Sequence, residues 1–79
     1  MPIVFRFGDY RFFFYSNEGN PREPIHVHVR KNDGEAKIWL KPVAVATSVG
    51  FDARTLRELT KLVEDHANLI EGTWNEYFA

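Results

Sequence analysis

Strand-like alternation of apolar and polar residues occupies the first part of the chain, and a helical repeat follows it. Residues 3–7 and 10–15 are rich in aromatic and β-branched side chains, and Gly8-Asp9 between them suits a two-residue hairpin turn. Residues 16–24 are dense in turn formers and contain two prolines, so we expect a loop there. The pattern therefore predicts a first hairpin followed by a long connection.

A second hairpin is predicted from residues 25–31 and 36–41, which both alternate strictly, with Asp33-Gly34 as the turn. A turn at these two residues places Val29 opposite Ile38 and Val27 opposite Leu40, which gathers the aliphatic side chains on one face. Residues 43–49 are β-branched and small, and form either a short fifth strand or an extended connector.

One long helix is predicted over residues 52–78, with Asp52 as its N-cap. Apolar residues recur there at three- and four-residue steps, which is typical of an amphipathic helix. Asn68 and Gly72 are the positions where this helix could bend or break. The apolar stripe consists of Leu56, Leu59, Val63, His66 or Ala67, Ile70, Trp74 and Tyr77.

These elements indicate an α+β fold in which an antiparallel sheet of two β-hairpins packs on one long C-terminal helix. The sheet has four strands, or a short fifth if residues 43–49 form a strand and not a connector. The 79 residues form a single domain, 1–79, that is β-rich over 1–49 and helical over 52–78. The chain contains no cysteine, which excludes disulfides and thiolate chemistry. With no signal peptide or membrane-length apolar run, we expect a cytoplasmic protein that does not contact membranes.

The charges are unevenly distributed. Residues 1–51 hold seven bases and five acids, net +2, whereas residues 52–78 hold three bases and six acids, net −3. The predicted registers place Arg6 opposite Arg11 and Arg30 opposite Lys37, like-charge pairs that destabilise a sheet unless an anion covers them. We expect no acidic side chain on the sheet face that points away from the helix. Its predicted binding residues are Arg6, Arg11, Tyr15, His26, His28, Arg30, Lys37, Trp39 and Lys41, beside Phe13.

A basic and aromatic face of this kind has three interpretations. It resembles a platform for single-stranded RNA or DNA, where nucleobases stack on aromatic rings and Arg or Lys side chains neutralise phosphates. It equally resembles an interface with a partner protein or with a second copy in a homodimer. The third interpretation is an ordinary half-solvated sheet whose aromatic residues are covered by the long loop.

The H-x-H pair of His26 and His28 offers two chemistries. Metal binding would need a third ligand, and neither Glu23, Glu35 nor His66 is placed there by spacing. The neighbouring bases would also repel a cation, so we expect no metal and no cofactor. The pair could instead serve as general acid and base on a phosphodiester, whereas His66 is expected to be a bonded core histidine.

The chain resembles the domain of unknown function 4160 family of small prokaryotic, including bacterial, proteins along its whole length. The resemblance rests on MPIVFRFGDYRFFFYSNE, EPIHVHV, EAKIWLKPV, GFDARTLREL and WNEYF. At position 41 it favours an acidic residue, where this chain has Lys41. The family motif falls on Glu23, Pro24, His26, His28, Val29, Lys37, Trp39, Leu40, Pro42, Trp74, Asn75 and Phe78.

The resemblance implies a partner, because members are often encoded beside or fused to domain of unknown function 2442 proteins, and the two are suspected to form a toxin-antitoxin module. Our leading hypothesis is a non-enzymatic interaction module of such a pair. It would bind a small partner protein, and RNA or DNA as a further candidate, through the basic and aromatic face. The alternative is a metal-independent ribonuclease toxin that uses His26 and His28.

Overall fold

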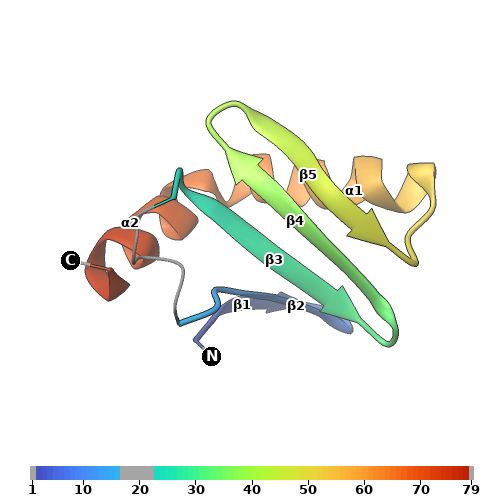
Figure 1. Cartoon of the computed structure of the whole chain (residues 1–79), viewed down its shortest axis with the longest axis horizontal. Coiled ribbons are helices and arrows are strands. Elements are labelled where there is room, and N and C mark those ends of the chain that lie inside the picture. The colour runs from blue at the N-terminus through green and yellow to red at the C-terminus, as the bar shows by residue number, and fades with distance from the viewer. Residues whose placement is uncertain (1, 17–22, 79) are drawn as a thin grey trace.

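The protein is described from a computed structural model over residues 2–16 and 23–78. Within these residues, five strands form one antiparallel sheet in the order β1-β2-β3-β4-β5, and two helices follow (Figure 1). The predicted α+β class and the fifth strand are confirmed, whereas most of the predicted loop lies outside the described residues. The elements are β1 Ile3–Phe7, β2 Tyr10–Phe13, β3 His26–Lys31, β4 Gly34–Leu40, β5 Val43–Val49, α1 Ala53–Asp65 and α2 Ala67–Tyr77.

The first hairpin turns at Gly8-Asp9 as predicted, with Gly8 at a φ of 57°. Phe5 pairs with Phe12 and Arg6 with Arg11, which confirms the predicted register near the turn. The register shifts between Ile3 and Phe5, so Ile3 lies opposite Phe13 and not opposite Phe14 as predicted. The irregularity in β1 therefore changes the pairing only at the open end of the hairpin.

The second hairpin turns one residue earlier than predicted. Lys31 pairs with Gly34, so Asn32 and Asp33 form the turn, and Asn32 adopts a φ of 53° that asparagine tolerates better than most residues. Val27 therefore lies opposite Ile38 and Val29 opposite Ala36, so the predicted pairings of Val27 with Leu40 and of Val29 with Ile38 are wrong. Moving the turn by one residue shifts the partner of each β3 residue by two positions along β4. Because two is an even number, each side chain keeps its predicted face.

Glycine is required at position 34 because a side chain there would clash with Phe51, and not because of the turn. A Cβ atom on Gly34 would lie 2.5 Å from Cε1 and 2.8 Å from Cδ1 of Phe51. The Phe51 ring, which precedes α1, packs directly on the backbone of β4 at this position. This contact explains why glycine follows Asp33 although the turn itself ends one residue earlier.

The predicted single helix is divided into α1 and α2 at His66, and neither helix has the length and hydropathy to cross a membrane in the described part of the chain. Asp52 caps α1 as predicted, because its Oδ1 accepts a hydrogen bond of 2.7 Å from the Thr55 amide. The His66 ring stacks on Phe5 at 4.2 Å and its Nδ1 lies 2.8 Å from the Leu62 carbonyl oxygen. His66 is therefore the bonded histidine that was expected, and the break occurs there and not at Asn68 or Gly72.

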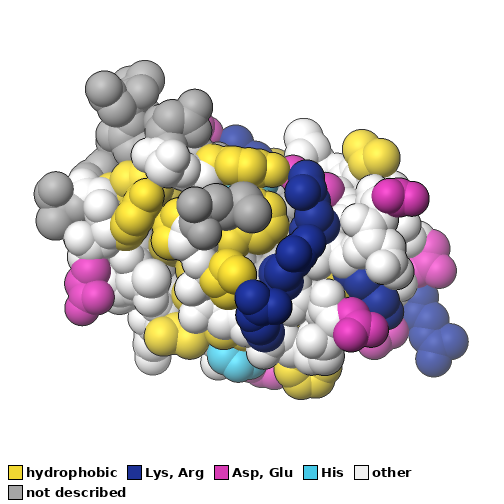
Figure 2. All heavy atoms as spheres, turned by 90° about the horizontal axis from the view of Figure 1, so that it is seen from below, with side chains coloured by type: hydrophobic (Ala, Val, Ile, Leu, Met, Phe, Trp, Pro, Cys, Tyr) yellow, Lys and Arg dark blue, Asp and Glu magenta, His cyan; other side chains and the backbone are white. Residues whose placement is uncertain are grey.

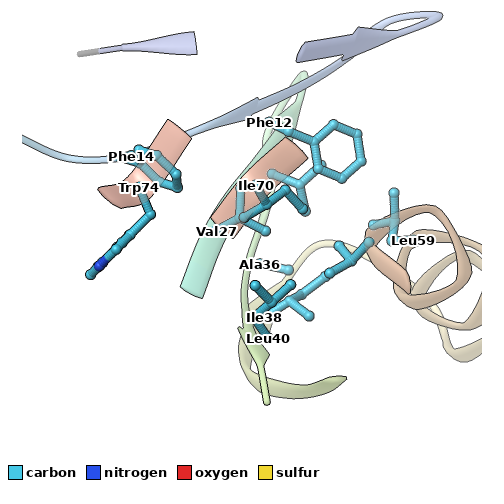
Figure 3. Packing of buried hydrophobic residues seen from close by; sticks show 11 residues of the cluster. Phe12, Phe14, Val27, Ala36, Ile38, Leu40, Leu59, Ile70 and Trp74 are labelled. Carbon is cyan, nitrogen blue, oxygen red and sulfur yellow. The ribbon is translucent and has the colours of Figure 1, made fainter. Parts of the chain in front are cut away.

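The helices cover one face of the sheet and bury its aliphatic and aromatic side chains (Figures 1 and 3). Each large side chain removed from water contributes about 1.5–3 kcal/mol. Phe14, just after β2, is fully buried and meets the Trp74 ring edge-on at 5.2 Å. Tyr77 was predicted on the buried stripe but is exposed, and Phe78 packs on Trp74 in its place. The core comprises Phe12, Phe14, Val27, Val29, Ala36, Ile38, Leu40, Leu59, Val63, Ile70 and Trp74.

Candidate functional site

The face of the sheet that points away from the helices, here called the outer face, carries most of the predicted binding residues in cross-strand rows. Arg6 pairs with Arg11 and Arg11 pairs with Arg30, and we call these three residues the arginine row. Figure 2 shows a continuous band of Lys and Arg side chains crossing the molecule beside a hydrophobic area. The sheet therefore brings Arg30 next to the two arginines of the first hairpin.

An acidic side chain belongs to the outer face, contrary to our expectation. Because the second hairpin turns one residue earlier, Arg30 lies opposite Glu35 and not opposite Lys37. The Arg30 guanidinium donates to Glu35 through Nε at 3.0 Å and through Nη2, and Tyr15 donates its hydroxyl to the other carboxylate oxygen at 3.0 Å. The hydrogen bond and charge of Glu35 raise the pKa of Arg30 above its ordinary value. Glu35 thus closes one end of the arginine row.

The two predicted lysines are also paired with acids. Lys37 Nζ lies 2.9 Å from Glu23 Oε1 and 4.5 Å from the centre of the Trp39 ring. Lys41 follows β4 and was predicted on the basic face of the sheet, but its Nζ lies 2.6 Å from Glu71 Oε2 on α2. Lys41 therefore joins the sheet to the second helix and is separate from the arginine row.

His26 is fully buried at the start of β3, opposite Trp39. Its Nδ1 lies 2.9 Å from the Pro24 carbonyl oxygen, and because a carbonyl only accepts hydrogen bonds, Nδ1 carries the proton. The ring lies 5.5 Å from Trp39, 5.1 Å from Trp74 and 5.1 Å from His28, measured between ring centres. His26 thus links the outer aromatic residues to the helical core.

His28 lies beneath Tyr15 and is 7% exposed. The Tyr15 ring stands edge-on to His28 at 4.5 Å, the buried Phe13 ring stacks on His28 at 5.6 Å, and the Phe13 and Tyr15 rings meet edge-on at 5.2 Å. Tyr15 is held in this place by its hydrogen bond to Glu35. The aromatic residues of the outer face therefore pack on each other and on the histidines, and Phe13 and His28 present little surface to solvent.

Catalysis by the H-x-H pair would need the imidazole nitrogens to reach a reacting atom within hydrogen-bond distance. Both rings are buried, and one nitrogen of His26 already bonds the backbone of Pro24. Across residues 2–16 and 23–78, no three His, Asp or Glu side chains gather as a metal-ligand set. The arrangement suits a structural role for the histidines.

An apolar depression of about 400 Å³ lies beside the buried histidines, at the end of the sheet where β3 begins and β4 turns into β5. Trp39 and Lys41 were among the predicted binding residues, whereas the other four lining residues were not, although Pro24 and Pro42 flank the strands that meet there. The half-buried Trp39 presents its indole to this depression. The lining residues are Pro24, Ile25, Trp39, Lys41, Pro42 and Ala44.

Of three comparisons with known proteins, only the one with protein-family models finds a match to the chain. Neither the curated proteins nor the solved structures contain a significant match to the chain. A family model described as Domain of unknown function (DUF4160) matches residues 9–75. Because this match covers most of the 79 residues, the chain belongs to the DUF4160 family.

Proposed function

We propose that this protein is a non-enzymatic interaction module that binds a small partner protein, as one component of a toxin-antitoxin-like pair. The observation that carries the proposal is the apolar depression around Trp39. Large aromatic side chains in preformed, largely apolar hollows are the usual anchors of protein interfaces. The occupant we propose is an apolar side chain of the partner.

The packing beneath Trp39 supports this role. Its indole contacts the His26 ring and the Lys37 ammonium group, and Lys37 is itself paired with Glu23. An anchor that is already held in place loses little conformational entropy when a partner binds. Ala44, directly opposite Trp39 on β5, is small enough to leave the indole accessible.

The burial of the histidines supports a binding function over the ribonuclease alternative. General acid and base catalysis needs both rings at the surface of a cleft, and the depression is lined by neither of them. His26 and His28 instead form part of the packing that positions Trp39 and Tyr15. We therefore assign them as positioning residues for the binding surface.

The partner we propose is a small protein of the domain of unknown function 2442 type encoded beside this chain. Co-expression of the two proteins, followed by calorimetric titration of the purified components, tests the proposal. Ala44→Arg fills the depression and should weaken partner binding at least about tenfold, since central interface positions carry most of the affinity. Val49→Arg places the same side chain on the same strand outside the depression, opposite Glu35, and should leave the affinity unchanged.

Equal affinity of the wild type and Ala44→Arg would contradict a binding site around Trp39. Circular dichroism should show that both variants are folded, because Ala44 and Val49 are exposed and their replacement removes no core contact.

A further inference from the structure

The arginine row is paired with a carboxylate at one end, and among residues 2–16 and 23–78 no carboxylate pairs with it at the other end. At the β4 end Glu35 pairs with Arg30. At the β1 end the row stops at Arg6, an exposed residue on the edge strand of the sheet (Figure 1). Among residues 2–16 and 23–78, no carboxylate lies within ion-pair distance of Arg6 or Arg11.

This arrangement destabilises the free protein and favours an anion next to it. Directly opposed like charges in a sheet are unfavourable, and Arg11 faces another arginine on both sides. The sheet also shows how such a charge is compensated, since Glu35 on the adjacent strand pairs with Arg30 by projecting from the directly opposite position. A carboxylate opposite Arg6 on an added strand would reproduce that arrangement.

The other side of β1 indicates what else such a strand would carry. Phe7, next to Arg6 in the strand, is 54% exposed and points to the helical side of the sheet. It borders a shallow hollow of about 210 Å³ that Leu62 also lines, with Glu58, Lys61 and Asp65 around it. Because neighbouring side chains of a strand point to opposite faces, an added strand would place apolar residues here and acidic residues beside Arg6.

We infer that the β1 edge binds an extended segment of the partner protein in which acidic and apolar residues alternate, with an Asp or Glu opposite Arg6. This inference rests on the proposed function and specifies the chemistry of the partner. Pairing along the β1 backbone supplies the hydrogen bonds, and the alternating side chains supply the specificity. A single-stranded nucleic acid fits less well, because Phe13 and His28 are too buried to stack on bases.

The test uses fluorescence anisotropy with three labelled probes, which are a short peptide of alternating valine and glutamate, the same peptide with glutamine for glutamate, and an oligouridylate. We expect the glutamate peptide to bind the full chain, more weakly at high salt, and the glutamine peptide and the RNA not to bind. Arg6→Gln should weaken peptide binding about tenfold, as expected for the loss of one charged hydrogen-bonded contact. Arg57→Gln, an exposed arginine on α1, is the matched control and should bind like the wild type.

Equal binding of the two peptides, or equal binding of the glutamate peptide by wild type and Arg6→Gln, would overturn the inference. Binding of the RNA alone, sensitive to Arg6→Gln, would also overturn it and make the row a phosphate site. The partner titration separates this inference from the proposed function. If Ala44→Arg loses partner binding and Arg6→Gln keeps it, the inferred contact between Arg6 and an acidic partner residue is wrong. The proposed function is then still supported.

Discussion

Replacement of Gly34 by alanine tests whether Phe51 packing, and not a turn, requires glycine at this position. The added Cβ would lie 2.5, 2.8 and 2.9 Å from three carbon atoms of the Phe51 ring, well inside the usual contact distance of about 3.5–4.0 Å. The ring must therefore move by about 1 Å away from β4. Overpacking of this kind costs about 1–3 kcal/mol, and we expect Gly34→Ala to lower the free energy of unfolding by about 2 kcal/mol.

A double-mutant cycle isolates the contact. In a Phe51→Ala background the obstacle is gone, and Gly34→Ala should then stabilise the protein slightly, by about 0.5 kcal/mol, because alanine has less backbone entropy to lose than glycine. Urea unfolding followed by tryptophan fluorescence measures all four proteins. Gly72→Ala in α2 is the control, since its added Cβ meets nothing within 4 Å and should stabilise the helix by about 1 kcal/mol. A Gly34→Ala cost that is the same in both backgrounds would refute the assignment to Phe51.

Three further predictions concern the histidines, the helix cap and the core. His28→Ala should lower the free energy of unfolding by about 2 kcal/mol, because it removes a buried ring that packs on both Phe13 and Tyr15. RNA incubated with either protein should stay intact, and cleavage by the wild type alone would contradict this. The hydrogen bond from the Thr55 amide lowers the pKa of Asp52 in the folded protein. The charged cap therefore stabilises the protein fully at pH values above the ordinary aspartate pKa of about 3.9, and this stabilisation is lost as the pH falls through the lower folded-state pKa. Urea unfolding at neutral and acidic pH should therefore show that acid lowers the free energy of unfolding more in the wild type than in Asp52→Asn. An equal decrease in both proteins would contradict this role of the Asp52 carboxylate. Phe14→Ala should cost about 3–5 kcal/mol in the same assay, and a loss under about 1 kcal/mol would show that its burial matters little.

The fold class and the faces of the strands could be predicted from local patterns, whereas the register of the second hairpin could not. Asn32-Asp33 and Asp33-Gly34 are both sound turn sequences, so local propensity does not choose between them; in the structure Gly34 lies in β4 against Phe51, which is distant in the sequence. The same holds for the helix break, because His66 leaves the helix where its ring stacks on Phe5 of the first strand. Local propensity at Asn68 and Gly72 carried no information about that contact.

The composition of the candidate site followed from the sequence only in part. The pairing of Arg6 with Arg11 was predicted because Gly8-Asp9 specifies that turn. The burial of His26 and His28 depends on Tyr15 and on Trp74, which come from segments on either side of β3 in the chain. Alternation identifies the face of a side chain but not what covers that face.

The most direct test of the account is a chemical-shift map of the isotopically labelled protein during titration with its partner. We expect large changes at the amides of Ile25, Lys41 and Ala44 and at the indole N–H of Trp39, which surround the apolar depression, and further changes at the amides of β1, where we infer that the partner adds a strand. Changes confined to the exposed side of α1, with the Trp39 indole signal unmoved at saturation, would contradict it.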